Sequence, residues 1–436
     1  MRKQVSKIVL AAALLPGILA GCGASGSGGA GGSEPAGGAR PKEPAGKVTV
    51  QFWHSLGGKN GEYISSAISR FNESQSKIEV VGTFQGSYDE TVTKLQQAVA
   101  AKSGPDVTML ERAYVQMFAD SDVLEDMTPF LKTSGMSVDD FTPGLMGHST
   151  FNKKLVSLPL NRSTPILHVN KTMLDEKGLA VPKTWEELRK VAEALVVKEN
   201  GEYKRYGYSM PYDTWYPIAM ISQAKGKFFN DAGTSIGFAG GEGVKTFKFL
   251  KDLQSTGALY YPPAQDSGNI VNQMFTSGKI GMMFQSTGVI GSLKDSVKFD
   301  YATAYLPMDQ VYATPTGGAN IALMAGSKNK EAAWEFIRWM MTDPKGGLQF
   351  VLDSGYLPFT KKMVESQQMK DLWAKEPNRK VAYDQLQYAT DTNKHVAWPQ
   401  VMQEFFKAIQ AIMYDGKNIE TTLDTFKKET ERLLKN

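Results

Sequence analysis

The stretch "VTVQFWHS", residues 48–55, opens the part of the chain that decides the fold. Val48, Val50 and Phe52 alternate with Thr49, Gln51 and Trp53, and this period of two predicts a β-strand. The same reasoning predicts, in chain order, a helix over 60–74, a strand over 77–84, a helix over 87–104 and a strand over 106–111.

Strands and helices that alternate at this rhythm are typical of an α/β domain whose sheet is largely parallel. In such sheets ligands bind beyond the carboxyl ends of the strands. Ser55, the turn at 86–88 and Glu111 lie at or just after those ends. We therefore expect a ligand at this edge of the sheet.

A second unit is predicted from about residue 155 onward, since the chain beyond residue 48 is long for a single core. It contains a helix in "PKTWEELRKVAEALV" (182–196), with Thr184 as N-cap and Glu187 completing a capping box. Trp334 and Trp339 fall on a later amphipathic helix and are predicted to be packing residues.

The N-terminus has the pattern of a bacterial lipoprotein. A basic start and a short apolar run predict a signal peptide over 1–21 that is too short to span a membrane. It ends in "LAGC", which resembles a lipobox, so Cys22 is the expected lipid attachment site. Residues 22–47 are rich in Gly, Ser, Ala and Pro and predict a flexible tether with a reach of about 25–30 Å.

Charge and motif content narrow the function classes. The formal net charge is +4, and removal of Arg2, Lys3 and Lys7 with the leader leaves +1, unlike a general nucleic-acid binder. The four histidines are scattered and no phosphate-binding loop of an ATPase is present. We therefore expect no metal, no cofactor and no nucleic-acid partner.

Seven motifs in order give the chain its resemblance to a known family. They are "FWHS" (52–55), "GPDV" (104–107), "STPILHVNK" (163–171), "PKTWEEL" (182–188), "MFTSGKIGMM" (274–283), "GGANIALMAGSKNKEAAWEFIRWM" (317–340) and "SGYLPFTKK" (354–362). This set resembles the extracellular solute-binding proteins of ABC importers, in their maltose-binding-protein-like cluster.

The resemblance implies a two-lobed α/β fold of the periplasmic-binding-protein type, class II, with a mainly parallel sheet in each lobe. Residues 48–158 and 311–353 would form the first lobe, and 159–310 and 354–436 the second. It further implies a monomeric, non-enzymatic receptor, lipid-anchored outside the cell membrane. The ligand would bind in the cleft, the hinge would close, and membrane permease subunits would receive the ligand.

Within the family, "GSYDE" (86–90), "NRSTPIL" (161–167) and "SGYLPFTK" (354–361) are similar to the sn-glycerol-3-phosphate-binding subgroup. By that resemblance the ligand-binding residues are Tyr88, Glu111, Ser163, Tyr212, Trp215, Ser286 or Thr287, Gly317 or Gly318, Tyr356 and Lys394. Two positions depart from the subgroup, which has an arginine at Lys394 and a tryptophan at Tyr212. The first weakens the case for bidentate phosphate binding, because lysine is a point charge.

The residue types suit a glycerol phosphate or a glycerophosphodiester. Hydroxyls, a Gly-Gly backbone and a lysine can hold a phosphate, while Glu111 can accept from two glycerol hydroxyls. A neutral sugar or oligosaccharide stays open, because aromatics suit such ligands. An extracellular glycosidase or phosphodiesterase is the enzyme alternative, but Glu111 has no evident carboxylate partner and no nucleophile motif is present.

Overall fold

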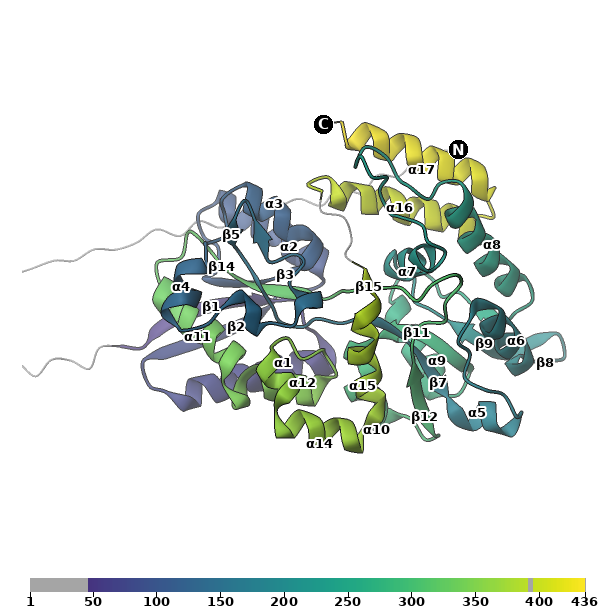
Figure 1. Ribbon diagram of the computed structural model, residues 1–436, viewed down its shortest axis with the longest axis horizontal. Helices are drawn as coiled ribbons and strands as arrows, with labels where there is room; N and C mark the ends of the chain where they lie inside the picture. The colour runs from purple at the N-terminus through teal and green to yellow at the C-terminus, as the bar shows by residue number, and fades with distance from the viewer. Residues whose placement is uncertain (1–45, 391–394, 436) are drawn as a thin grey trace, which may run out of the picture. The chain divides into compact units, whose positions relative to one another are not determined.

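Two β-sheets organise the residues that the computed structural model describes, 46–390 and 395–435 (Figure 1). The predicted signal peptide, Cys22, the tether up to residue 45 and Lys394 lie outside the described residues. Each sheet is flanked by helices, so the α/β class predicted from the sequence is confirmed.

The first sheet has the strand order β2-β1-β3-β14-β6. Its strands are β1 (Val48–His54), β2 (Ile78–Phe84), β3 (Val107–Glu111), β6 (Leu158–Pro159) and β14 (Ala319–Leu323). Strand β1 pairs in parallel with β2 and with β3, as the strand–helix rhythm predicted. Strand β14 runs antiparallel to both β3 and β6.

The second sheet has the order β10-β9-β11-β7-β12, and β8 pairs with β9 at its side. Its strands are β7 (Pro165–Asn170), β8 (Val197–Glu199), β9 (Glu202–Ser209), β10 (Leu259–Tyr260), β11 (Ile280–Ser286) and β12 (Tyr301–Ala304). Strand β9 pairs in parallel with β10 and β11, whereas β7 is antiparallel to β11 and β12. Both sheets are thus mixed rather than mainly parallel, because strands that arrive from the other lobe, such as β7 and β14, run against their neighbours.

The helices surround these sheets, and two short strand pairs complete the fold. The helices are α1 (Gly58–Ser74), α2 (Tyr88–Ala100), α3 (Val115–Asp120), α4 (Thr128–Thr133), α5 (Lys171–Glu176), α6 (Trp185–Leu195), α7 (Trp215–Gln223), α8 (Gly241–Ser255), α9 (Ser267–Thr276), α10 (Ile290–Ser296), α11 (Lys330–Thr342), α12 (Gln349–Ser354), α13 (Lys361–Glu365), α14 (Gln367–Lys375), α15 (Pro377–Asp384), α16 (Trp398–Met413) and α17 (Ile419–Leu433). The short pairs are β4 (Thr150–Phe151) with β5 (Lys154–Leu155), and β13 (Thr314–Pro315) with β15 (Ala389–Thr390).

Local sequence explains where the first helices lie. Helix α1 buries Ile64, Ala67, Ile68 and Phe71, the face predicted from their spacing. Thr184 is the N-cap of helix α6, and its hydroxyl accepts from the Glu187 backbone N–H, as predicted. The Glu187 carboxylate, however, accepts from the Lys183 backbone, so the reciprocal half of the predicted capping box is shifted by one residue.

The start of α2 places Tyr88 beyond the carboxyl end of β2. Ser87 and Glu90 form a capping box, in which each side chain accepts from the other residue's backbone N–H. Gly86 precedes them with φ +99°, and a Cβ there would lie 2.2 Å from the Glu90 carboxylate. Glycine therefore allows the tight turn that brings Tyr88 into the first helical turn.

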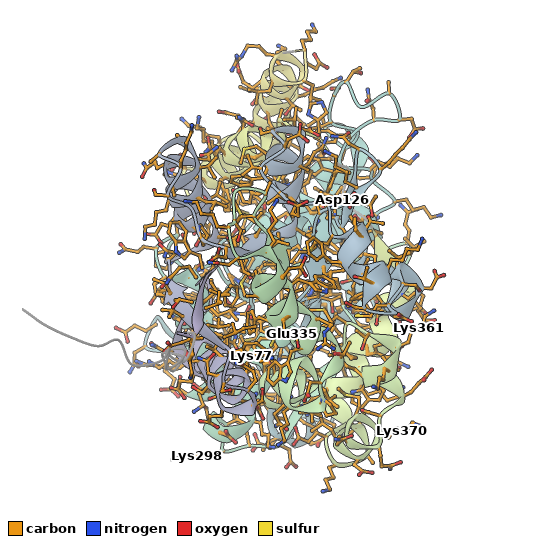
Figure 2. The ribbon with its side chains drawn as sticks, turned by 90° about the vertical axis from the view of Figure 1, so that its left-hand side faces the viewer. Lys77, Asp126, Lys298, Glu335, Lys361 and Lys370 are labelled. Carbon is orange, nitrogen blue, oxygen red and sulfur yellow. The ribbon has the colours of Figure 1, made fainter. Side chains whose placement is uncertain are left out.

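Two large apolar clusters form the cores of the lobes. Trp334 and Trp339 of α11 are buried in the first, as predicted, while Glu335 of the same helix faces outward (Figure 2). Phe359 and Met363 also pack into this first cluster. The predicted return to the second lobe at residue 354 therefore differs from the packing, because the residues that follow it are apolar and bury against first-lobe side chains.

The chain crosses between the sheets after β6 and again before β14. At the second crossing Gly318 has φ +81°, and a Cβ would lie 2.0 Å from the Asn161 carbonyl oxygen of the first crossing. The two crossings therefore touch backbone to backbone, which only glycine permits here. Of the helices in the described residues, none is both long and apolar enough to span a membrane.

Candidate ligand-binding site

A cavity of about 440 Å³ lies where β3, β11 and the two crossings meet the start of α16. Eight residues predicted from the sequence line it: Tyr88, Glu111, Ser163, Trp215, Ser286, Gly317, Gly318 and Tyr356. A larger hollow of about 740 Å³, beside residues 225–233, contains none of the predicted residues. The eight residues come from segments up to 268 positions apart in the chain, and the fold brings them to one place.

Two predicted residues do not line this cavity. The Tyr212 hydroxyl donates to the Phe406 carbonyl oxygen at 2.9 Å, so this ring supports Phe406, which does line the cavity. Thr287 is fully buried, whereas its neighbour Ser286 lines the cavity. Of the two alternatives at this position, the structure places Ser286 at the cavity.

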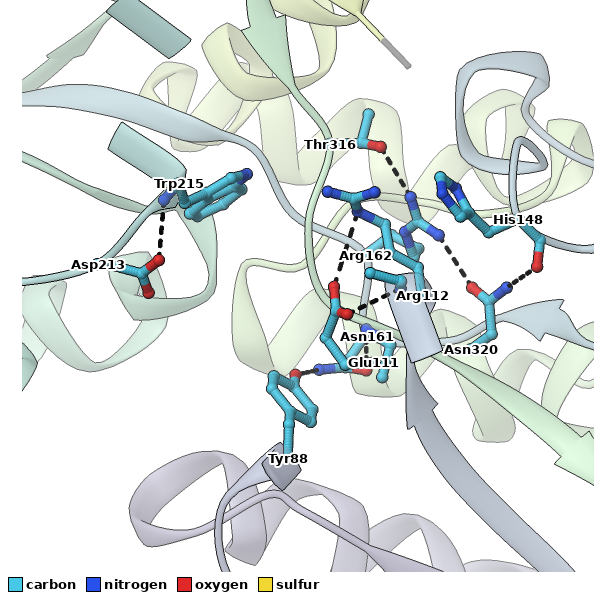
Figure 3. A network of polar contacts seen from close by, with 12 residues as sticks. Tyr88, Glu111, Arg112, His148, Asn161, Arg162, Asp213, Trp215, Thr316 and Asn320 are labelled. Atoms are coloured by element: carbon cyan, nitrogen blue, oxygen red, sulfur yellow. Dashed lines mark hydrogen bonds and ion pairs between the residues drawn. The ribbon is translucent and has the colours of Figure 1, made fainter. Parts of the chain in front are cut away.

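Glu111 and Arg112 form the charged centre of the first-lobe wall (Figure 3). Glu111 accepts from the Ala113 backbone N–H at 2.8 Å, and its Oε1 lies 3.8 Å from Nε of Arg112. Burial raises the pKa of Glu111, while the charges of Arg112 and Arg162 act in the opposite direction. Arg112 lies in the turn directly after β3, and the sequence reasoning that selected Glu111 missed it.

The first crossing holds the floor of the cavity in place. The buried Arg162 donates to Thr316 Oγ1 at 2.8 Å and to Asn320 Oδ1 at 2.9 Å (Figure 3). Ser163 and Gly317 exchange two backbone hydrogen bonds, of 3.2 and 2.7 Å. These contacts fix the Gly-Gly backbone against the first crossing, where it faces the cavity.

The second-lobe wall combines an acid with an indole ring. Asp213 accepts from the Trp215 backbone N–H at 2.9 Å, and burial raises the pKa of Asp213. The Trp215 ring lies close to Gly317, and its indole Nε1 is buried with no hydrogen-bond partner in the described structure.

Several lining residues were not predicted, although some stand inside motifs that were recognised. Asp89 belongs to "GSYDE" and accepts from the Tyr114 hydroxyl. Asn161, which donates to the Tyr88 hydroxyl but does not itself line the cavity, belongs to "NRSTPIL". Asp213 precedes the selected Trp215 by two positions, and the aromatic residues Tyr216 and Trp398 also line the cavity.

The cavity is built for binding a polar organic molecule. Among the described residues, no group of three or more His, Cys, Asp or Glu side chains is placed to hold a metal ion. Among the described residues, the lining offers one arginine, hydroxyls and backbone N–H groups together with carboxylates and aromatic rings, and carboxylates stand on both walls. Such a mixture holds small polar ligands by hydrogen bonds and covers their carbon atoms.

The known proteins that this chain resembles in sequence are bacterial solute-binding proteins. A family model described as "Bacterial extracellular solute-binding protein" matches residues 66–380. The chain is 25% identical over 361 residues to the sn-glycerol-3-phosphate-binding periplasmic protein UgpB of Pectobacterium atrosepticum, covering 77% of this chain and 79% of that protein. The UgpB of Escherichia coli K12 is also 25% identical, over 78% of this chain and 80% of that protein.

Solved structures share the fold. UgpB from Mycobacterium tuberculosis in complex with glycerophosphocholine superposes with a TM-score of 0.81 at 24% identity, over 89% of this chain and 99% of that one. An ABC substrate-binding protein from Listeria monocytogenes in complex with cycloalternan gives the same TM-score and coverage at 19% identity. The matched family model, the two-lobed fold and the interlobe cavity agree: this chain belongs to the bacterial extracellular solute-binding protein family.

Proposed function

We propose that this chain is the receptor of an ABC importer and captures a glycerol-phosphate ligand, either sn-glycerol 3-phosphate or a glycerophosphodiester. The observation that carries the proposal is the two-sided cavity. Arg112, Ser163, Ser286 and the Gly317–Gly318 backbone offer donors in this cavity, while Glu111 on the first-lobe wall and Asp213 on the second-lobe wall offer acceptors.

The charge of the lining favours the diester over the monoester. Among the described residues, Asp89, Glu111 and Asp213 line the cavity together with a single arginine, Arg112. A phosphate monoester carries about −1.5 to −2 charges at neutral pH, whereas a diester carries one. A diester with a cationic headgroup would also place its ammonium near Asp213 and the Trp215 ring, where charge and π-face both attract it.

The relatives support the same ligand class. The curated relatives are named for sn-glycerol 3-phosphate, and the M. tuberculosis UgpB was solved with glycerophosphocholine. Glycerophosphocholine is therefore the first ligand to test on this chain.

A neutral oligosaccharide is the second candidate, because the lining is rich in aromatic rings. Tyr88, Tyr114, Trp215, Tyr216 and Trp398 all line the cavity. Rings of this kind can cover sugar faces while carboxylates accept from sugar hydroxyls. Structural neighbours bound to cycloalternan and to maltotriose belong to the same fold.

Delivery follows from the two-lobed fold. A lipid on Cys22 and the tether over 22–47 would hold a monomeric body at the outer face of the membrane. Contacts to the ligand from both lobes would favour a closed form, with bending at the crossings, and a membrane permease would receive that form. The protein would act without catalysis.

Calorimetric titration of the purified full chain tests the proposal. We expect binding heat with glycerophosphocholine and with glycerol 3-phosphate, tighter with the diester, and none with maltose. Binding of maltose together with no heat from either phosphate compound would establish the second candidate instead. Phosphorus NMR of the same mixture checks for turnover, and released product would refute a purely binding role.

A further inference from the structure

Three hydroxyl groups that line the cavity have one feature in common: each accepts a hydrogen bond from an N–H group of the protein. Asn161 Nδ2 donates to the Tyr88 hydroxyl oxygen at 2.8 Å (Figure 3). Asn60 Nδ2 donates to the Tyr356 hydroxyl oxygen at 3.2 Å. The Gly288 backbone N–H donates to Ser286 Oγ at 3.1 Å.

The orientation of the Asn161 amide is fixed by the backbone. The Ala319 N–H donates to Asn161 Oδ1 at 3.0 Å, and a backbone N–H can only donate. Nδ2 must therefore be the atom that faces Tyr88. Since an amide NH₂ has no acceptor, the Tyr88 proton cannot point at Asn161 and is left to another partner.

Asn60 acts on Tyr356 in the same way. Its Nδ2 also donates to the Gly288 carbonyl oxygen at 3.3 Å, and a carbonyl oxygen can only accept. The NH₂ group is thereby directed at both Gly288 and Tyr356. Tyr356 consequently accepts from Asn60, and its own proton is likewise free.

Both phenols keep these protons at neutral pH. Burial raises the pKa of Tyr88 and of Tyr356 above the ordinary tyrosine value. The two residues line the same cavity as Arg112, which can only donate. Their O–H groups, the Ser286 hydroxyl and this guanidinium therefore offer donors to a ligand, while the Glu111 carboxylate beside Arg112 is an acceptor on the same wall.

We infer that Asn161 and Asn60 are positioning residues that commit the Tyr88 and Tyr356 hydroxyls to donate into the cavity, so that on this wall the two hydroxyls select an acceptor-only group, the phosphate oxygens of the ligand. The inference rests on the proposed function and deepens it, because it assigns the phosphate end of the ligand to this wall. A sugar hydroxyl can donate as well as accept, so it does not require this polarity.

Exchanging each asparagine for aspartate reverses the polarity with little change in shape. In Asn161→Asp one carboxylate oxygen still accepts from Ala319. The other can only accept, so the Tyr88 hydroxyl donates its proton to it instead of to the ligand. In Asn60→Asp the carboxylate demands the Tyr356 proton. Ser65→Asp, on an exposed position of α1, is the matched control for an added charge on that helix.

The experiment is calorimetry with glycerophosphocholine on the full chain, using Asn161→Asp and Tyr88→Phe singly and together, and Asn60→Asp and Tyr356→Phe in the same way. We expect each aspartate variant to weaken binding by about tenfold to hundredfold, and Ser65→Asp by less than about twofold. The effect of Asn161→Asp should shrink severalfold when residue 88 is phenylalanine, because the lost proton is then absent already.

Thermal unfolding of every variant shows which chains are folded, and Asn60→Asp, at a partly exposed site, provides the test if Asn161→Asp does not fold. Unchanged affinity in the aspartate variants would overturn the inference alone. Equal losses with and without the tyrosine hydroxyl would overturn it too, because a structural or purely electrostatic role gives that result. No binding of glycerophosphocholine or glycerol 3-phosphate by the unmodified chain would refute the proposed function, and the inference with it.

Discussion

Replacing Gly317 with alanine is expected to weaken ligand binding while leaving the fold nearly as stable. A Cβ at this position would lie 2.5 Å from Cζ2 and 2.9 Å from Cε2 of Trp215. The flat indole would have to retreat by roughly 1 Å to reach ordinary van der Waals contact. Gly317 is not among the residues with positive φ, so the backbone itself accepts alanine.

The cost of this displacement should appear mainly in the bound state. Overpacking of this size costs about 1–3 kcal/mol, which corresponds to roughly a 5- to 150-fold rise in Kd. Trp215 is only partly buried and faces the cavity, so in the free protein its ring can move into space that the ligand otherwise occupies. We expect the free energy of unfolding to fall by less than about 1 kcal/mol.

Calorimetry with glycerophosphocholine and urea unfolding measure the two effects separately. Gly326→Ala is the matched control, because a Cβ there meets nothing within 4 Å and its φ is ordinary. Binding by Gly317→Ala as tight as that of the unmodified chain, or a loss of affinity only in proportion to lost stability, would contradict this prediction.

Three further predictions follow from the same geometry. Gly318→Ala should lower the free energy of unfolding by about 2–4 kcal/mol, because alanine is strained at a positive φ and its Cβ would clash with the Asn161 backbone. An unchanged midpoint of urea unfolding would contradict this. Burial lowers the pKa of His168 to about 3, so the unfolded chain binds a proton that the folded chain excludes, and the free energy of unfolding should fall as pH drops from about 6.5 towards 3. In His168→Gln the free energy of unfolding, measured with urea, should depend less on pH in that window. An unchanged pH dependence would exclude His168 as its source. Asp213→Asn should weaken the binding of glycerophosphocholine more than that of glycerol 3-phosphate in calorimetry, because only the former carries a cation. Equal losses of affinity for the two ligands would show that the headgroup does not bind at Asp213.

Much of the fold could be predicted from local sequence patterns. The alternation in residues 48–54 and the helical spacing of Ile64, Ala67, Ile68 and Phe71 depend on neighbours in sequence, and the structure has them as predicted. Strand direction was harder. The antiparallel position of β14 depends on how the chain returns between lobes, which no local pattern encodes.

The candidate site could likewise be predicted only in part from the sequence. The motif resemblance predicted eight residues that line the cavity, but it could not separate them from Tyr212, which does not. The Tyr212 hydroxyl donates to the carbonyl oxygen of Phe406, a residue 194 positions later in the sequence. Arg112 was missed because its direction depends on the turn that Glu111 caps, not on a residue pattern. At the end of β11, only one of two adjacent hydroxyl residues, Ser286, lines the cavity.

We propose that one cavity holds a glycerophosphodiester with its phosphate at the Tyr88 and Tyr356 hydroxyls and its headgroup at Asp213 and Trp215. A crystal structure of the full chain with glycerophosphocholine tests this most directly. We expect phosphate oxygens within hydrogen-bond distance of the Tyr88 and Tyr356 hydroxyls, and the ammonium against Trp215 and Asp213. A ligand bound elsewhere, or bound with these two ends reversed, would contradict it.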